Sequence, residues 1–116
     1  MKRPGAHRSF LIDVEGVLVR DKAYRALPGT VEWLATVAGR GVPFCLVSNN
    51  TTMRPGEQLA ALREAGFDLA ENRMVGALAE GVRWLRERGR RSILWLGVPE
   101  MEGFWRDEGF LTDDPG

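Results

Sequence analysis

Short apolar runs of strand length alternate along this chain with segments of helical periodicity, and this alternation restricts its fold more than any other feature. The runs are FLI at 10–12 with Val14 beyond it, VPFCLV at 42–47 and SILWLGV at 92–98. Runs without polar positions are typical of strands buried on both faces of a parallel sheet. Strands that alternate with helices favour a parallel sheet wound right-handedly over segregated layers. We therefore expect a doubly wound α/β fold.

Four segments have the residue spacing of short amphipathic helices. They are residues 27–41, 55–66, 74–89 and a last segment that starts near Pro99 and ends before Gly109. In the first segment, Thr30 is a predicted N-cap. In the third, an apolar stripe runs from Val75 to Leu85, with charged residues on the opposite side. The expected order of elements is strand, helix, strand, helix, helix, strand, helix.

Composition and charge exclude several classes of protein. The 116 residues are enough for one hydrophobic core, and 16 basic residues balance 16 acidic ones, so a nucleic-acid partner is not expected. No apolar stretch is long enough to cross a membrane, and the basic start lacks the apolar core of a signal peptide. The single cysteine, Cys45, cannot form an internal disulfide, which indicates a reducing compartment. We expect a cytoplasmic protein without a membrane partner.

Polar residues follow the first two apolar runs at the point where each run ends. Asp13, Glu15 and Gly16 follow the first run, and Ser48, Asn49 and Asn50 follow the second. Ligands of open α/β sheets bind beyond the carboxyl ends of the strands. Asp13 and Ser48 are separated by about one strand-crossover-strand unit, so we expect their side chains at the same rim of the sheet. At Gly16 the chain can turn sharply, and backbone amides there can face an anion.

Several stretches, in this order and spacing, resemble one known family. FLIDVEGVLVR, ALPGTVEWLATVAGRGVPFCLVSNNTT, LREAGFD and the later GALAEGVRWLRERG and SILWLG are similar to the amino-terminal half of the haloacid dehalogenase (HAD) superfamily. The nearest branch is the nitrophenylphosphatase-like one, in which a large cap is inserted after the second motif. The resemblance covers about residues 9 to 112. It implies a three-layer, HAD/Rossmann-like parallel sheet, with an incomplete core and the start of a cap region.

The resemblance also implies a role for each polar residue. Asp13 matches the nucleophile that attacks a phosphate, forms an aspartyl-phosphate and helps to hold Mg²⁺. Glu15 stands where the family usually has a second aspartate, which protonates the leaving oxygen, activates water and is a further candidate metal ligand. The implied phosphate-binding residues are Ser48, Asn49, Asn50 and Gly16. A small phosphorylated metabolite is the expected substrate, and Mg²⁺ is the expected cofactor.

Two departures from the family pattern bear on activity. The extra methylene of Glu15 moves its carboxyl outward by about one carbon–carbon bond, and a displacement of that size can lower a rate about a hundredfold. The cation of the third motif, usually a lysine, is missing because no lysine follows Lys22. Asp113 and Asp114 are more simply a solvated acidic end than the metal ligands of the fourth motif.

The resemblance divides the chain into residues 1–70, a partial core with the first two motifs, and residues 71–116, a partial cap-like α/β segment. In a complete relative these two parts would pack against elements that the 116 residues do not include, and we expect the exposed apolar faces to favour a homodimer or a strand-exchanged dimer. In an alternative packing the second part folds back into the same domain, and ILWLG joins the core sheet.

Two functions remain open on the sequence alone. The first is Mg²⁺-dependent hydrolysis of phosphate monoesters through an aspartyl-phosphate, weak or lost in so short a chain. The second is a non-catalytic HAD-like binding or interaction module. A phosphoacceptor receiver domain is disfavoured, because Ser48, Asn49 and Asn50 stand where its phosphorylatable aspartate is required, and a late lysine is missing.

Overall fold

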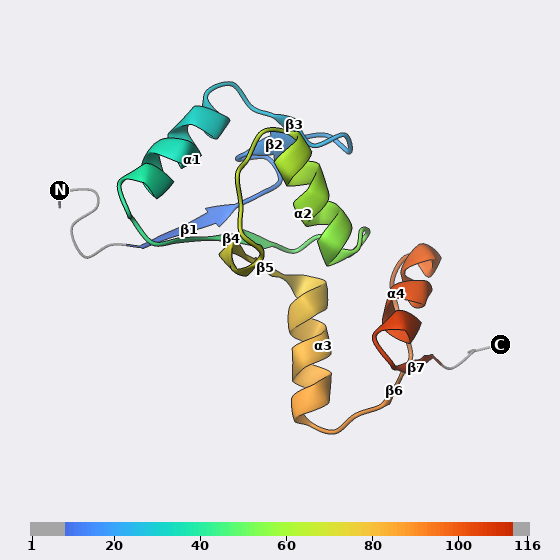
Figure 1. Cartoon of the computed structure of the whole chain (residues 1–116). Coiled ribbons are helices and arrows are strands. Elements are labelled where there is room, and N and C mark those ends of the chain that lie inside the picture. Colours follow the sequence, from blue (N-terminus) through green and yellow to red (C-terminus); the bar gives the residue numbers. More distant parts are fainter. Residues whose placement is uncertain (1–8, 113–116) are drawn as a thin grey trace. The chain divides into compact units, whose positions relative to one another are not determined.

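Residues 9–112 are described in the computed structural model of this chain, and Figure 1 shows their elements. The helices are α1 (Thr30–Gly39), α2 (Pro55–Glu64), α3 (Ala77–Glu87) and α4 (Glu102–Asp107), with two short 3₁₀ turns at Glu71–Arg73 and Pro99–Met101. The strands are β1 (Phe10–Asp13), β2 (Val19–Arg20), β3 (Arg25–Ala26), β4 (Phe44–Ser48), β5 (Met74–Gly76), β6 (Ser92–Ile93) and β7 (Leu111–Thr112). In the described part, contacts divide the chain into a first unit, residues 9–48 and 58–75, and a second unit, residues 49–57 and 76–112.

A three-stranded sheet in the order β1-β4-β5 forms the centre of the first unit. Strands β1 and β4 are parallel, with Asp13 paired to Val47 at their carboxyl ends. The predicted α/β class with a parallel sheet is therefore confirmed. The third strand is β5, although Met74 and Val75 were predicted as the first turn of a helix. That prediction was wrong because Gly76 keeps an extended backbone and α3 begins only after it.

The two faces of β1 differ in burial, which corrects the prediction that this strand is buried on both faces. Ile12 and the adjacent Leu46 of β4 are buried, whereas the Leu11 side chain is 77% exposed. Successive side chains of a strand point to opposite faces, so one face of β1 is covered and the other is open within the described residues. An apolar run shows that a strand is buried somewhere, but it does not show which face is covered.

A hairpin of β2 and β3 joins β1 to α1, and the sequence patterns did not predict it. Its antiparallel strands pair Val19 with Ala26 and Arg20 with Arg25. Thr30 was predicted as the N-cap of the following helix, but the cap is Gly29, whose φ of 82° suits a residue without a side chain. The Thr30 hydroxyl instead donates hydrogen bonds to the carbonyls of Leu18 and Leu27, at 3.1 and 2.7 Å.

The second unit has its own apolar core between α3, α4 and their connections. Its buried members are Leu78, Val82, Met101, Phe104, Trp105 and Phe110. Only Ser92 and Ile93 of the SILWLGV run form a strand, and β6 pairs in parallel with β7 rather than with the core sheet. The alternative in which ILWLG joins that sheet is therefore wrong, because the register places Ile93 beside Thr112.

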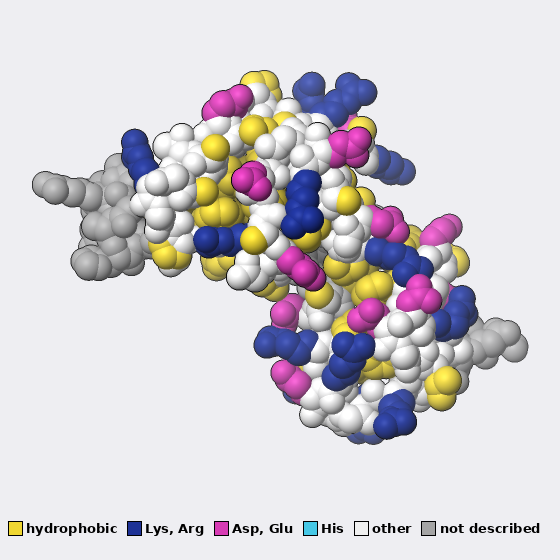
Figure 2. Space-filling view, viewed as in Figure 1, with side chains coloured by type: hydrophobic (Ala, Val, Ile, Leu, Met, Phe, Trp, Pro, Cys, Tyr) yellow, Lys and Arg dark blue, Asp and Glu magenta, His cyan; other side chains and the backbone are white. Residues whose placement is uncertain are grey.

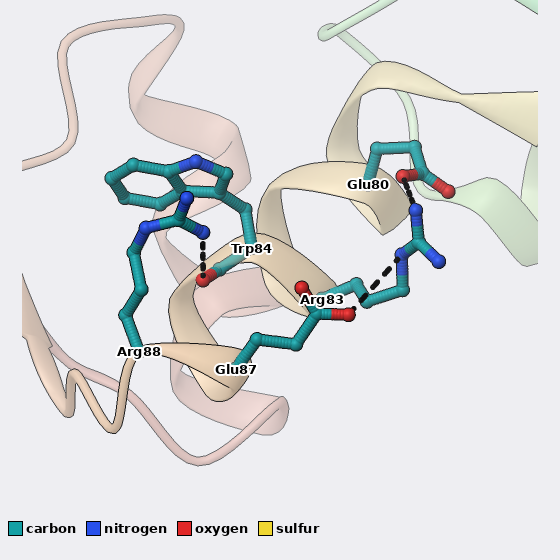
Figure 3. Close-up of polar contacts among 5 residues, drawn as sticks. All are labelled: Glu80, Arg83, Trp84, Glu87 and Arg88. Carbon is teal, nitrogen blue, oxygen red and sulfur yellow. Dashed lines mark hydrogen bonds and ion pairs between the residues drawn. The ribbon is translucent and has the colours of Figure 1, made fainter.

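The outward face of α3 is polar, as the helical spacing predicted. Arg83 contacts Glu80 at 2.8 Å and Glu87 at 3.9 Å, and the Arg88 guanidinium stacks 4.1 Å from the centre of the Trp84 ring (Figure 3). Exposed pairs of this kind stabilise a protein by only about 0.5 kcal/mol each. The helix is therefore held mainly by Leu78 and Val82 on its buried side.

Acidic and basic side chains are interspersed on the face of the molecule shown in Figure 2. This mixing agrees with the balanced charge of the chain and gives that face no single-sign field. None of the helices in residues 9–112 combines the length and the apolar character needed to cross a bilayer.

Candidate active site

The ends of β1 and β4 place Asp13 and Ser48 at the same edge of the sheet. The register that pairs Asp13 with Val47 leaves Ser48 one residue further along the neighbouring strand. Asp13 is exposed, and its carboxylate makes no hydrogen bond or ion pair to any residue in 9–112. The Ser48 side chain is only 8% exposed. The two strand ends therefore carry an accessible carboxylate on β1 and a nearly buried hydroxyl on β4, and the register places Asp13 on the same face as Val47 rather than Ser48.

A tight turn follows Asp13 and carries Glu15 back toward β4. The carbonyl of buried Val14 accepts hydrogen bonds from three successive amides, those of Val17, Leu18 and Val19, at 3.0–3.3 Å. Gly16 has a φ of 87°, and its own amide donates to the Val19 carbonyl at 2.7 Å. That amide is used inside the turn, so a contribution of Gly16 to phosphate binding stays a prediction.

The Glu15 carboxylate is the centre of a polar network in the first unit. The Ser48 hydroxyl donates to it at 2.9 Å from Oε1 and 3.3 Å from Oε2, and the Tyr24 hydroxyl donates to Oε2. The Gln58 side-chain amide lies 3.0 Å from the same Oε2. Hydrogen bonds from these donors fix the position of the Glu15 carboxyl group. The structure thus brings Glu15 and Ser48 together.

Tyr24 and Gln58 also belong to this site, although neither was predicted from the sequence. Tyr24 is 4% exposed and has a φ of 54°, a left-handed conformation that an aromatic residue seldom adopts. No pattern in the sequence points to it. Gln58 is 3% exposed and lies one turn before Leu62 on the buried side of α2. A polar residue on the apolar stripe of a helix needs a buried partner, and this signal could have identified Gln58.

Asn49 and Asn50 follow Ser48 in the chain but belong to the second unit by their contacts. The Asn50 side-chain oxygen accepts hydrogen bonds from the amide and the hydroxyl of Thr52, at 2.8 and 2.7 Å. These bonds form an Asx turn that fixes the loop before α2. Asn49 is exposed. Phosphate binding by either residue stays a prediction.

Whether these residues suit a metal ion depends on their donor atoms. Within residues 9–112, no group of three or more His, Cys, Asp or Glu side chains is arranged to hold a metal. Mg²⁺ is often bound by only one or two carboxylates together with water and substrate phosphate, and the accessible Asp13 carboxylate fits that role. Glu15 fits less well because its oxygens already accept from three donors. Asp113 and Asp114 lie outside the described residues.

Comparisons with known proteins point to one family. A family model described as haloacid dehalogenase-like hydrolase matches residues 10–111. The dihydroxyacetone phosphatase of Corynebacterium glutamicum (strain R) is 29% identical over 88 residues, which are 76% of this chain and 31% of that protein. The chain therefore spans about a third of the length of this curated relative.

Solved structures agree with this similarity. The p-nitrophenyl phosphatase from Archaeoglobus fulgidus superposes with a TM-score of 0.77 at 25% identity, over 91% of this chain and 40% of the other. The 4-nitrophenylphosphatase from Thermotoga maritima gives a TM-score of 0.73 at 25% identity, over 93% of this chain and 41% of the other. The fold described above is thus found within longer proteins.

Proposed function

The chain belongs to the haloacid dehalogenase-like hydrolases, and from this membership we propose that it carries the nucleophile-bearing part of a phosphatase for phosphate monoesters. The nitrophenylphosphatase-like branch that the motifs indicated is also supported by the two superposed structures. One observation carries the proposal: Asp13 and Ser48 end two paired parallel strands, with Asp13 accessible to a ligand.

The proposed reaction has two displacements at phosphorus. In the first, an Asp13 carboxylate oxygen forms a bond to phosphorus while the bond from phosphorus to the ester oxygen breaks, and protonated Glu15 gives its proton to that oxygen. In the second, water attacks the aspartyl-phosphate, Glu15 takes up a proton from the water, and Asp13 is released together with inorganic phosphate. After the two steps, Asp13 is again a free carboxylate and Glu15 is again protonated.

Other residues contribute binding rather than bond making. The Ser48 hydroxyl can donate its single proton to a phosphoryl oxygen once it turns away from Glu15. A Mg²⁺ ion, held by Asp13, would neutralise part of the charge on the phosphate. The proposed substrate is a small phosphorylated metabolite, and the names of the relatives support this class: each of those proteins is called a phosphatase.

Turnover of nitrophenyl phosphate by the 116-residue chain tests this proposal. We expect release of nitrophenol that requires Mg²⁺ and that falls by at least about a thousandfold in Asp13→Asn, since an amide cannot act as the nucleophile. Asp68→Asn is the matched control, because Asp68 is an exposed aspartate of the same unit. Equal background rates for the unchanged chain and Asp13→Asn would rule out catalysis by this chain alone.

The hydrogen bond from Ser48 to Glu15 favours a second candidate function, a non-catalytic phosphate-binding module. The Ser48 hydroxyl donates to Glu15 in this structure, so it is already engaged in a hydrogen bond without a substrate. Titration calorimetry with inorganic phosphate and Mg²⁺ separates the two candidates. Binding without turnover supports the module, and turnover that depends on Asp13 supports the phosphatase.

A further inference from the structure

We propose that Gln58 is a positioning residue that holds the Glu15 carboxylate in place through two hydroxyl groups, those of Tyr24 and Ser48. This inference rests on the proposed function, in which Glu15 transfers the proton. It concerns a buried residue of α2 that hydrogen-bonds Glu15 but takes no part in bond making at phosphorus.

The position of the Gln58 amide nitrogen supports this role. Nε2 lies 2.7 Å from the Ser48 hydroxyl oxygen, 2.8 Å from the Tyr24 hydroxyl oxygen and 3.0 Å from Oε2 of Glu15. The hydroxyls of Ser48 and Tyr24 use their own protons toward Glu15, so all three neighbours act as acceptors here and the NH₂ group, not the carbonyl oxygen, faces them. Gln58 is 97% buried, so its amide group depends on these three acceptors for its hydrogen bonds.

Counting protons shows how the network is organised. An amide NH₂ group has two protons for these three neighbours: the two shortest contacts are to the hydroxyls of Ser48 and Tyr24, and the longer contact to Glu15 shares one of the protons. Each hydroxyl accepts one bond from Gln58 and uses its own single proton to donate to Glu15. Two parallel chains of hydrogen bonds therefore run from one amide to one carboxylate. Such chains polarise one another and strengthen each bond.

The length of the Glu15 side chain explains why this support matters. Glutamate has one more rotatable bond than aspartate, so an unsupported carboxylate would sample several positions. The three donors come from separate parts of the first unit: the β2–β3 turn, β4 and α2. Without Gln58 each hydroxyl loses the donor that helps to orient it toward Glu15. The carboxylate would then spend less time in reach of the leaving oxygen, and about 1 Å of misplacement can reduce a rate about a hundredfold.

Steady-state kinetics of Gln58→Leu with nitrophenyl phosphate provide the first test. Leucine keeps the volume of the side chain but donates no hydrogen bond, so we expect kcat to fall by about ten- to a hundredfold while KM changes by less than about twofold. Glu64→Leu, an exposed position on the same helix, is the control and should leave both constants unchanged. In a Glu15→Gln background, Gln58→Leu should lower kcat no further, because the two residues act as a unit.

A second measurement does not depend on turnover. In protein labelled with ¹³C at the glutamate carboxyl carbons, the Glu15 signal is assigned by its loss in Glu15→Gln. We expect Gln58→Leu to shift that signal and Glu64→Leu to leave it in place. If the unchanged chain shows no turnover above Asp13→Asn, the proposed function fails while a shifted signal still supports the positioning of Glu15. An unshifted signal, or an equal loss of kcat in the Glu15→Gln background, overturns the inference.

Discussion

At position 15 a glutamate reaches donors that an aspartate would not reach. Its carboxylate accepts from Tyr24, Ser48 and Gln58, and two of these residues are among the most deeply buried polar groups of the first unit. Tyr24 also adopts a left-handed backbone conformation, whose strain of about 1 kcal/mol or more must be offset by its surroundings. The interactions of its ring and hydroxyl provide that compensation. This network therefore ties the turn between β2 and β3 to the strand that bears Ser48.

Shortening this side chain should weaken the folded state. In Glu15→Asp the carboxylate retracts by about one carbon–carbon bond from its donors, and the buried Gln58 amide loses an acceptor. We expect the free energy of unfolding to decrease by about 1–3 kcal/mol, as for other buried groups that lose a hydrogen-bond partner. Urea denaturation followed by circular dichroism measures this change. Glu64→Asp, at an exposed position of α2, should shift the midpoint hardly at all, and an equal shift in both variants would contradict the account.

How far this site could be predicted depends on the kind of signal each residue leaves. Asp13, Glu15 and Ser48 follow apolar runs, and the parallel pairing of two strands then brings the strand ends together. Tyr24 lies in a turn between two-residue strands, which carry no periodicity. Its contact with Glu15 depends on one unusual φ value, which the sequence does not specify. Gln58 left a weak signal as a polar residue on an apolar helical stripe.

Among the elements, α3 shows how closely a helix can pack against an aromatic core. Gly81 lies on its inner side, where an added Cβ atom would be 3.3 Å from the edge of the Trp105 ring. That ring is itself surrounded, since the rings of Trp95, Phe104 and Phe110 have centres within 5.2–5.8 Å of it. A glycine here weakens the isolated helix but allows Trp105 to be buried.

Replacing this glycine should therefore destabilise the second unit. In Gly81→Ala the gain in helix propensity, about 1 kcal/mol, is opposed by overpacking against a ring that three other aromatic rings surround, which costs about 1–3 kcal/mol. We expect a net loss of about 1 kcal/mol, seen as a lower melting temperature. Gly56→Ala in α2 meets no atom within 4 Å and should raise the melting temperature slightly. A higher melting temperature for Gly81→Ala would contradict this prediction and show that the Trp105 ring can shift to make room for the methyl group.

The elements themselves were predicted where their periodicity was long. Leu78 and Val82 lie on the buried side of α3, and β1 and β4 coincide with apolar runs. The errors fall at boundaries and in short pieces. Val75 has the apolar character of the α3 stripe but belongs to β5, and most of the SILWLGV run is irregular because only two of its residues pair with β7. Strands of two or three residues leave no pattern that a sequence window can separate from a helix end.

At the scale of the whole molecule, the chain consists of two units and matches only part of longer proteins. The described residues form two units, and the solved relatives are longer proteins of which the chain covers 40–41%. Leu11, on the open face of β1, is 77% exposed, and β1 lies at one edge of the three-stranded sheet. An edge strand with an exposed leucine can accept a further strand. The homodimer or strand-exchanged dimer expected from the sequence remains a prediction.

The most direct test of the central claim is to trap the phosphoryl group on the protein. The chain is mixed with Mg²⁺ and a ³²P-labelled phosphate monoester, quenched in acid within milliseconds, digested and analysed by mass spectrometry. The account predicts label on the peptide that contains Asp13, and none on the same peptide from Asp13→Asn. Label on another residue, or turnover by the unchanged chain without any labelled Asp13, would contradict it.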